Sequence, residues 1–235
     1  MRIGIMQPYF MPYIGYFQLI NYVDLFVIYD NIKYTKKGWI NRNRILVNGK
    51  IEYISLPLKK DSDYLDINQR FLSDNFYQDK IKLINKIKGS YSKATYYSDV
   101  INLLENTIDY SDINLFEYIY FSIKQINEYI GIKTPIIKSS SLDFDIHSYK
   151  GEEKVLAICK ALNADEYINS IGGVNLYSQT NFKKQGINLY FLESKEKIYK
   201  QFGREFIPYL SIIDVLMFND IDSIKSMLDV YEIQS

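Results

Sequence analysis

The sequence predicts an α/β fold: a mostly parallel sheet core built from the N- and C-terminal parts of the chain, with a helical insertion at about residues 70–132. Residues 1–30 have the order strand, loop, helix, strand, which is the unit that builds parallel sheets. A second unit of this kind occurs between residues 165 and 192, and residues 75–131 between the two are helical in pattern. At about 150 residues per domain, we expect the 235 residues to form a single α/β domain over residues 1–235.

The first unit is defined by short apolar runs and by proline. Residues 3–6 are apolar and predict a strand, whereas Pro8 and Pro12 exclude a regular helix or central strand between them. Helical spacing begins at Tyr13, and residues 25–29 predict a buried strand that ends at Asp30. Ligands of parallel sheets bind beyond the carboxyl ends of the strands, so the loop after residue 6 and the segment after Asp30 are expected to face a ligand.

The remaining elements follow from periodicity and helix-end signals. A helix over 113–130 has an apolar stripe, a start capped by Ser111 or Asp112, and a stop at Gly131. Residues 31–48 are basic and irregular. Further strands are predicted at 51–58, 135–139, 165–170 and 187–192, and further helices at 151–163, near 175–184, around 209–218 and at 221–231.

Composition excludes several classes of protein. Lys and Arg total 28 against 28 Asp and Glu, and this zero net charge argues against a nucleic-acid binder. One Cys and one His exclude an internal disulfide and a Cys- or His-rich metal site, and we expect no metal and no cofactor. No apolar run is long enough for a membrane span, and the proline-broken N-terminus does not have the pattern of a signal peptide. These features predict a cytoplasmic protein.

The first candidate site is the loop at residues 7–12, together with Gly15. Two prolines stiffen this loop, and Gly15 allows close approach of the backbone near the helix start. Exposed helix N–H groups there favour a phosphate or carboxylate, which makes Gln7 and Gly15 candidate substrate-binding residues. A rigid structural turn with aromatic residues in the core is an equally good interpretation.

The second candidate site runs from Asp30 to Arg44 and carries five cations together with the only Trp. Arg side chains suit phosphate oxygens, an indole can stack on a base or a sugar, and Asn side chains can bind hydroxyls. Arg42 and Arg44 are two residues apart and would point the same way on an extended segment. A solvated basic loop is the alternative, but the position at the ligand edge favours function. The candidate substrate-binding residues are Lys36, Trp39, Asn41, Arg42 and Asn43.

The third candidate site is the Gly172-Gly173 pair, which follows the strand predicted at 165–170. Paired glycines before a helix let the backbone approach a phosphate or substrate closely, and a plain tight turn is the alternative. Cys159 lies on the apolar face of a predicted helix and is interpreted as a core residue. His147, in a polar connection, is interpreted as an exposed or hydrogen-bonded side chain.

Three segments of the chain resemble the WbqC-like protein family of bacteria: IGIMQPYFMPYIGYFQLINYVDLFVIYDNIKYTKKGWINRNRI, YINSIGGVNLYSQTNFKKQGINLYFL and FIPYLSIIDVLMFN. The resemblance implies a cytoplasmic role in making or modifying a nucleotide-linked sugar, often an amino sugar, for O-antigen and other surface polysaccharides. The positions that match the family's motif are Gln7, Pro8, Pro12, Gly15, Asp30, Lys36, Trp39, Asn41, Arg42, Asn43, Gly172 and Gly173.

Two functional hypotheses follow. The first is a transferase that adds an acyl or aminoacyl group to a nucleotide-linked amino sugar, with Lys36 and Arg42 on phosphate, Trp39 stacking, and Asp30 as the catalytic base. The second is a non-catalytic module that binds a nucleotide sugar or docks an acyl or aminoacyl carrier protein. Both require the early basic stretch and the late glycine pair to converge on one pocket at the same edge of the sheet.

Overall fold

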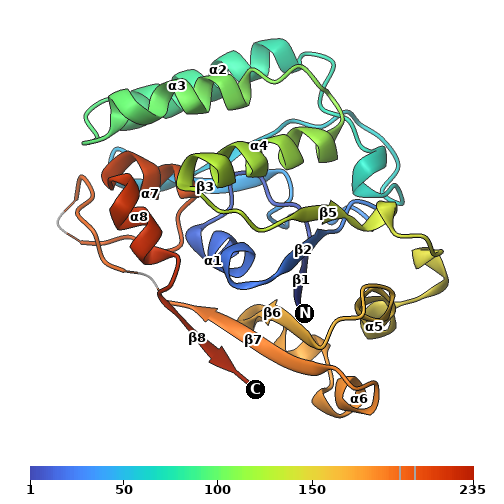
Figure 1. Ribbon diagram of the computed structural model, residues 1–235. Coiled ribbons are helices and arrows are strands. Elements are labelled where there is room, and N and C mark those ends of the chain that lie inside the picture. Colours follow the sequence, from blue (N-terminus) through green and yellow to red (C-terminus); the bar gives the residue numbers. More distant parts are fainter. Residues whose placement is uncertain (196, 204) are drawn as a thin grey trace.

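The computed structural model describes residues 1–195, 197–203 and 205–235, and its centre is a six-stranded sheet in the order β5-β2-β1-β6-β7-β8 (Figure 1). Five of the strands are parallel to their neighbours, and β8 runs antiparallel to β7. The strands are β1 (Arg2–Met6), β2 (Leu25–Ile28), β5 (Ile136–Lys138), β6 (Glu166–Ser170), β7 (Asn188–Ser194) and β8 (Tyr231–Gln234). The predicted α/β fold with a sheet built from both parts of the chain is confirmed.

The predicted helical insertion consists of three helices, α2 (Phe76–Tyr91), α3 (Tyr97–Ile108) and α4 (Leu115–Ile130), which lie above the sheet in Figure 1. Gly131 ends α4 with φ 83°, as predicted. The predicted cap was wrong, because the Asn114 side chain accepts the N–H groups of Phe116 and Glu117. Asp112 instead accepts the N–H of Asn114 and so orders the residue that makes the cap.

The two faces of the sheet bury different residues because side chains alternate along a strand. On β2, Phe26 and Ile28 face the cluster formed with α1 (Ile14–Tyr22), α4, α7 (Ile212–Phe218) and α8 (Ile221–Met227). Val27 between them faces the other cluster, with α5 (Gly151–Ala161) and α6 (Gln179–Lys184). Cys159 is fully buried in this second cluster. The result is a sheet covered by helices on both faces.

Two strands form a hairpin that the sequence analysis did not resolve. β3 (Arg42–Val47) pairs with β4 (Lys50–Ser55), and Asn48 and Gly49 make the turn with φ 49° and 75°. Asn-Gly between two apolar runs is a strong hairpin signal, so β3 could have been recognised inside the basic segment. The strand predicted at 51–58 is β4, which ends three residues earlier.

The C-terminal prediction was also partly wrong. α8 ends at Met227, and residues 231–234, the first of which was predicted as helix, form β8 along the edge of β7. The helix predicted near 175–184 is divided into a 3-10 helix, η4 (Ile171–Leu176), and the short α6. The open edge of β7 offers backbone hydrogen bonds that local helical propensity does not reveal.

The order of the strands creates a switch point between β1 and β6. The chain passes from β1 to β2 and β5 on one side, and then crosses back to β6 and β7 on the other side. A crevice forms at the carboxyl ends of the strands where the direction changes, and ligands of such sheets bind there. Among the described helices, none has both the length and the apolar character needed to cross a membrane.

Candidate functional site

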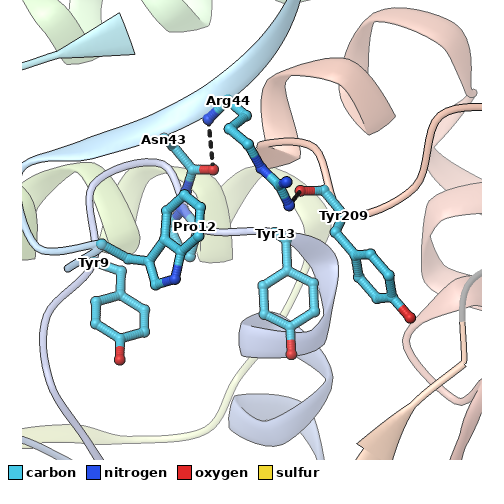
Figure 2. Close-up of a pocket in the computed structure, with 7 residues that line it drawn as sticks. Tyr9, Pro12, Tyr13, Asn43, Arg44 and Tyr209 are labelled. Carbon is cyan, nitrogen blue, oxygen red and sulfur yellow. Dashed lines mark hydrogen bonds between the residues drawn. The ribbon is translucent and has the colours of Figure 1, made fainter. Parts of the chain in front are cut away.

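Two cavities lie at the carboxyl edge of the sheet, and they share Tyr9. The first, which we name the aromatic pocket, has a volume of about 170 Å³ and is lined by Tyr9, Pro12, Tyr13, Trp39, Asn43, Arg44 and Tyr209 (Figure 2). The second, which we name the switch-point pocket, has a volume of about 370 Å³; its lining includes Gln7, Tyr9, Tyr29, Asn169, Ser170, Gly172, Gly173 and Tyr177. The early basic stretch reaches one pocket and the late glycine pair reaches the other, and the loop at residues 7–12 joins them.

Backbone hydrogen bonds bring the loop at residues 7–12 against the basic segment. The N–H of Phe10 donates to the carbonyl oxygen of Ile40 at 3.0 Å, and the Asn43 side chain donates to the carbonyl oxygen of Phe10 at 3.1 Å. Asn43 is buried, so its amide braces the wall of the aromatic pocket from behind. This predicted site residue lies at the site and holds two of its segments together.

A third segment, near the C-terminus, completes the aromatic pocket. The hydroxyl of Ser211 donates to the carbonyl oxygen of Met11 at 2.7 Å, and the N–H of Ile212 donates to that of Pro12 at 2.8 Å. Tyr209 is thereby held beside Tyr13, with ring centroids 6.3 Å apart. Tyr209 lies in one of the three segments that resemble the family, but nothing in the sequence distinguished it within that segment, because only these contacts between distant segments place it at the pocket.

Arg44 is the cation of the aromatic pocket. Its Nη2 donates to the carbonyl oxygen of Tyr209 at 2.8 Å (Figure 2). Its guanidinium lies 5.2 Å from the ring centre of Trp39. Its Nε is buried and has no hydrogen-bond partner among the described residues. A buried N–H without an acceptor is costly, so Arg44 carries an unsatisfied donor next to the pocket that its side chain lines.

Arg42 and Arg44 lie at the two ends of one stack, with the rings of Tyr53 and Trp39 between them. The Arg42 guanidinium lies 4.9 Å from the ring centre of Tyr53, and Tyr53 stacks on Trp39 with centroids 6.3 Å apart. Arg42 also donates to the carbonyl oxygens of Lys37 and, at 3.0 Å, Gly38. Arg42 therefore shapes the turn that presents Trp39, and it does not line either pocket.

Backbone strain concentrates around the aromatic pocket. Met11, Lys37 and Tyr209 have φ of 44°, 66° and 57°, a left-handed conformation that is unfavourable for residues with a side chain. Tyr209 lines the pocket, and Met11 and Lys37 lie within two residues of a residue that does. Strained residues of this kind cost about 1–3 kcal/mol each and cluster at functional sites, which supports assigning this pocket a function.

The two glycines of the switch-point pocket differ in role. A Cβ atom on Gly173 would lie 2.1 Å from Nδ2 of Asn169, whereas one on Gly172 would meet nothing within 4 Å. Asn169 is only 4% exposed, and its Oδ1 accepts the N–H of Ser170 at 2.8 Å. Gly173 is thus required so that the Asn169 amide can lie against the backbone, while Gly172 leaves space in the pocket.

The switch-point pocket carries no charged side chain among the described residues that line it. Burial raises the pKa of both Tyr29 and Tyr177, so their hydroxyls stay protonated near neutral pH. Gln7 is held at its carbonyl oxygen by the Tyr16 hydroxyl at 2.9 Å. The pocket therefore offers amides and hydroxyls that orient a polar group, without a residue that ionises readily.

Gly15 acts on the aromatic pocket through Tyr13. A Cβ atom on Gly15 would lie 2.4 Å from the Tyr13 ring. The absence of a side chain at Gly15 therefore lets the Tyr13 ring fold back over the start of α1 and line the pocket. The close approach predicted at this glycine is made by an aromatic ring of the protein itself.

Asp30 lies outside both pockets and is surrounded by donors. It is 2% exposed and accepts hydrogen bonds from the Ser140 N–H at 2.8 Å, Asn68 Nδ2 at 3.1 Å and the hydroxyls of Ser139 and Ser140. Both carboxylate oxygens are occupied. This geometry favours a role in joining the end of β2 to the turn after β5 and to the 3-10 helix η1 (Ile67–Gln69).

Two other predicted residues also lie away from the pockets. Lys36 is exposed and pairs with Asp63 at 2.7 Å. Asn41 accepts the Tyr34 hydroxyl at 2.9 Å and donates to the carbonyl oxygen of Leu56 at 2.8 Å. The side chain of His147 is 60% exposed, and its Nε2 lies 3.6 Å from Asp66. The described residues include no group of three or more His, Cys, Asp or Glu that could hold a metal ion.

The structure places Trp39 and Asn43 in the aromatic pocket and Gln7, Gly172 and Gly173 in the switch-point pocket, with Gly15 acting through Tyr13. The expected convergence of the basic stretch and the glycine pair on one pocket was therefore wrong, because the two stretches reach separate pockets that share Tyr9. The structure adds residues that sequence reasoning did not select as site residues: Tyr9, Tyr13, Tyr29, Arg44, Asn169, Tyr177 and Tyr209. Arg44 could have been recognised from the Asn-Gly hairpin signal, because that signal places Arg44 on a strand, two residues after Arg42.

A family model and one curated relative match most of the chain. The family model described as "WbqC-like protein family" matches residues 7–226, which include all the pocket-lining residues named above. The chain is 28% identical over 217 residues to "Uncharacterized protein Rv1507c" of Mycobacterium tuberculosis (strain ATCC 25618 / H37Rv), an alignment that covers 92% of each chain. No solved structure matches. A family match over nearly the whole chain, with its segments meeting at one edge of the sheet, shows that this protein belongs to the WbqC-like protein family.

Proposed function

We propose that the protein is a transferase of bacterial surface polysaccharide biosynthesis, which adds an acyl or aminoacyl group to the amine of a nucleotide-linked sugar. The observation that carries the proposal is the aromatic pocket, where the Arg44 side chain lines a cavity together with the rings of Trp39, Tyr9 and Tyr13. Arginine suits phosphate oxygens, and aromatic rings stack on bases and sugars. Phosphate and ring binding together describe one end of a nucleotide-linked sugar.

The sizes of the two pockets support a ligand that extends across both. Ligand pockets are typically about 300–1,000 Å³, and the aromatic pocket, at about 170 Å³, is too small for a whole nucleotide sugar. The switch-point pocket, at about 370 Å³, adjoins it at Tyr9. In this proposal one end of the nucleotide sugar occupies the aromatic pocket, and its amine reaches the amides of Gln7 and Asn169.

The chemistry of the lining limits how the reaction proceeds. No carboxylate, imidazole or thiol lines either pocket among the described residues. We therefore assign catalysis to orientation of the amine and polarisation of the acyl carbonyl by amide and hydroxyl donors. Asp30 and Arg42 become positioning residues, which hold the end of β2 and the Trp39 turn.

Docking of an acidic carrier protein on the basic segment receives less support. Lys36 pairs with Asp63, Arg42 donates to carbonyl oxygens of its own turn, and Arg44 lines the aromatic pocket. Three of the five cations of the segment are thus turned toward the protein itself. A small anion bound by Arg44 fits this arrangement better than an acidic protein surface does.

The test is calorimetric binding of UDP, GDP, CDP and dTDP and their amino sugars, with the product sought by mass spectrometry. Arg44→Met should weaken nucleotide affinity at least about tenfold, because a charge-assisted hydrogen bond contributes about 1.5–3 kcal/mol. Arg2→Met is the matched control, since Arg2 pairs with Asp24 where β1 begins, at the opposite edge of the sheet. Equal affinity in wild type and Arg44→Met, or no binding of any nucleotide, would refute the proposal.

A further inference from the structure

A third cavity adjoins the switch-point pocket and shares no lining residue with the aromatic pocket. It has a volume of about 410 Å³ and shares Tyr29, Ile32, Leu176 and Tyr177 with the switch-point pocket. Beyond these shared residues it reaches Lys150 and Lys154 at the start of α5. We name the switch-point pocket and this cavity together the donor groove.

Charge is distributed unevenly along the donor groove. The part near Gln7 and Asn169 has no charged lining, whereas the far part has Lys150, Lys154 and Glu152. Glu152 is already bonded to the N–H of Ser178 and, at 2.6 Å, to the side chain of Asn181. Among the described residues, neither lysine has a carboxylate within 4 Å. The far end of the groove is therefore suited to an anion.

We propose that the donor groove binds the acyl donor of the proposed transfer reaction, and that this donor is a thioester on a phosphopantetheine arm. The phosphate lies between Lys150 and Lys154, the neutral arm lies along Tyr29 and Tyr177, and the thioester carbonyl lies beside Gln7 and Asn169. This inference rests on the proposed function.

The position of the cations discriminates among activated acyl donors. An acyl phosphate or acyl adenylate has its phosphate directly on the carbonyl carbon, which would place that charge in the part of the groove without a cation. A phosphopantetheine thioester separates the carbonyl from the phosphate by a neutral chain of amides. Amide groups along that chain match the tyrosine hydroxyls and side-chain amides of the lining, because buried polar groups need hydrogen-bond partners.

A thioester also suits a site without an ionisable base. The amine nitrogen attacks the carbonyl carbon, a C–N bond forms, the C–S bond breaks, and the proton lost by nitrogen ends on sulfur to give a thiol. The products are an amide and the free phosphopantetheine thiol, so no oxidant or further reactant is needed. The thiolate is a good leaving group, and this reduces the demand on the protein to that of holding both reactants in line.

Coenzyme A and a carrier protein both supply this arm, and binding measurements on the nucleotide-saturated protein distinguish them. We expect coenzyme A, or the holo form of a carrier protein, to bind. The two variants that test the groove are Lys150→Glu/Lys154→Glu, which reverses its cationic end, and Gly172→Leu, which fills an open position in its lining. Each variant should weaken binding of the phosphopantetheine arm at least about tenfold. The charge reversal removes charge-assisted hydrogen bonds to the phosphate, and Gly172→Leu blocks the space that the arm occupies.

Matched controls separate this effect from a general one. Gly89 on α2 is exposed and equally open, and Lys183 and Lys184 are exposed on α6 outside the groove. Gly89→Leu and Lys183→Glu/Lys184→Glu should bind the arm as wild type does, and these two controls and Lys150→Glu/Lys154→Glu should keep their nucleotide affinity. The inference is overturned if neither form of the arm binds, if apo and holo carrier proteins bind equally, or if the groove variants behave as the controls do. If the wild-type protein binds no nucleotide, the proposed function is refuted instead.

Discussion

Replacing Asp30 tests whether this carboxylate holds the structure or transfers a proton. Asp30→Ala removes the acceptor of two donors that have fixed directions, the Ser140 N–H at 2.8 Å and Asn68 Nδ2 at 3.1 Å. An unsatisfied buried donor costs about 1–3 kcal/mol, and partial burial of these two favours the lower half of that range. The serine hydroxyls can turn to other acceptors, so they are left out of the sum. The two donors of fixed direction together lower the free energy of unfolding by about 3 kcal/mol.

The assay is urea unfolding together with thermal unfolding. For a chain of 150–250 residues, about 3 kcal/mol lowers Tm by about 6–12 °C. Asp30→Asn keeps the shape and one acceptor oxygen, so it should lose less than Asp30→Ala and still bind nucleotides when folded. Asp63→Ala is the control, because among the described residues this exposed carboxylate forms an ion pair with exposed Lys36 alone, and it should change stability by no more than about 0.5 kcal/mol.

One result would contradict this reasoning. If Asp30→Ala unfolds at the same urea concentration as wild type and yet has no turnover, then its hydrogen bonds do not stabilise the end of β2. Asp30 would in that case regain the role of catalytic base. The stability measurement therefore decides between the two roles, independently of which donor or sugar is used.

Three further predictions concern Gly15, Gly173 and Asp214. Gly15→Ala places a Cβ 2.4 Å from the Tyr13 ring, so it should displace the ring and weaken nucleotide binding at least about tenfold with little loss of stability. Calorimetry measures the affinity and thermal unfolding measures the stability. Unchanged affinity would show that the position of the Tyr13 ring does not affect binding. Gly173→Ala forces the buried Asn169 amide from its place and should cost about 1–3 kcal/mol in urea unfolding, whereas an unaffected midpoint would contradict the close contact. Asp214 is buried in α7, and burial raises the pKa of its carboxyl group in the folded state. Because the folded protein holds this proton more tightly than the unfolded chain does, the free energy of unfolding should fall as pH rises from the unfolded-state pKa through the folded-state pKa. Asp214→Asn should remove that fall, and a wild-type stability that rises over this range relative to the variant would contradict the sign.

The sequence determined the fold class because its signals are local. Apolar runs separated by a proline loop and a helix predict a parallel unit wherever they occur, and Gly131 stops α4 by a conformation that glycine alone adopts freely. The same local reasoning predicted Gln7, Trp39, Asn43 and the glycine pair as site residues, because loops that follow parallel strands end at one edge of the sheet, and these residues line the two pockets. It failed at β8, where the hydrogen bonds come from β7 and not from the segment itself.

The tertiary structure alone decided which side chains of the basic segment reach a pocket. Arg42 and Arg44 are equivalent in sequence pattern, yet one donates to carbonyl oxygens of its own turn and the other donates to Tyr209, a residue 165 positions away. Asp30 likewise looks like a base at the end of a strand, but a turn 110 positions later surrounds it with donors. Contacts between distant segments depend on the packing of the whole chain, and this is why the sequence gives the region of the site while only the fold assigns the role of each residue.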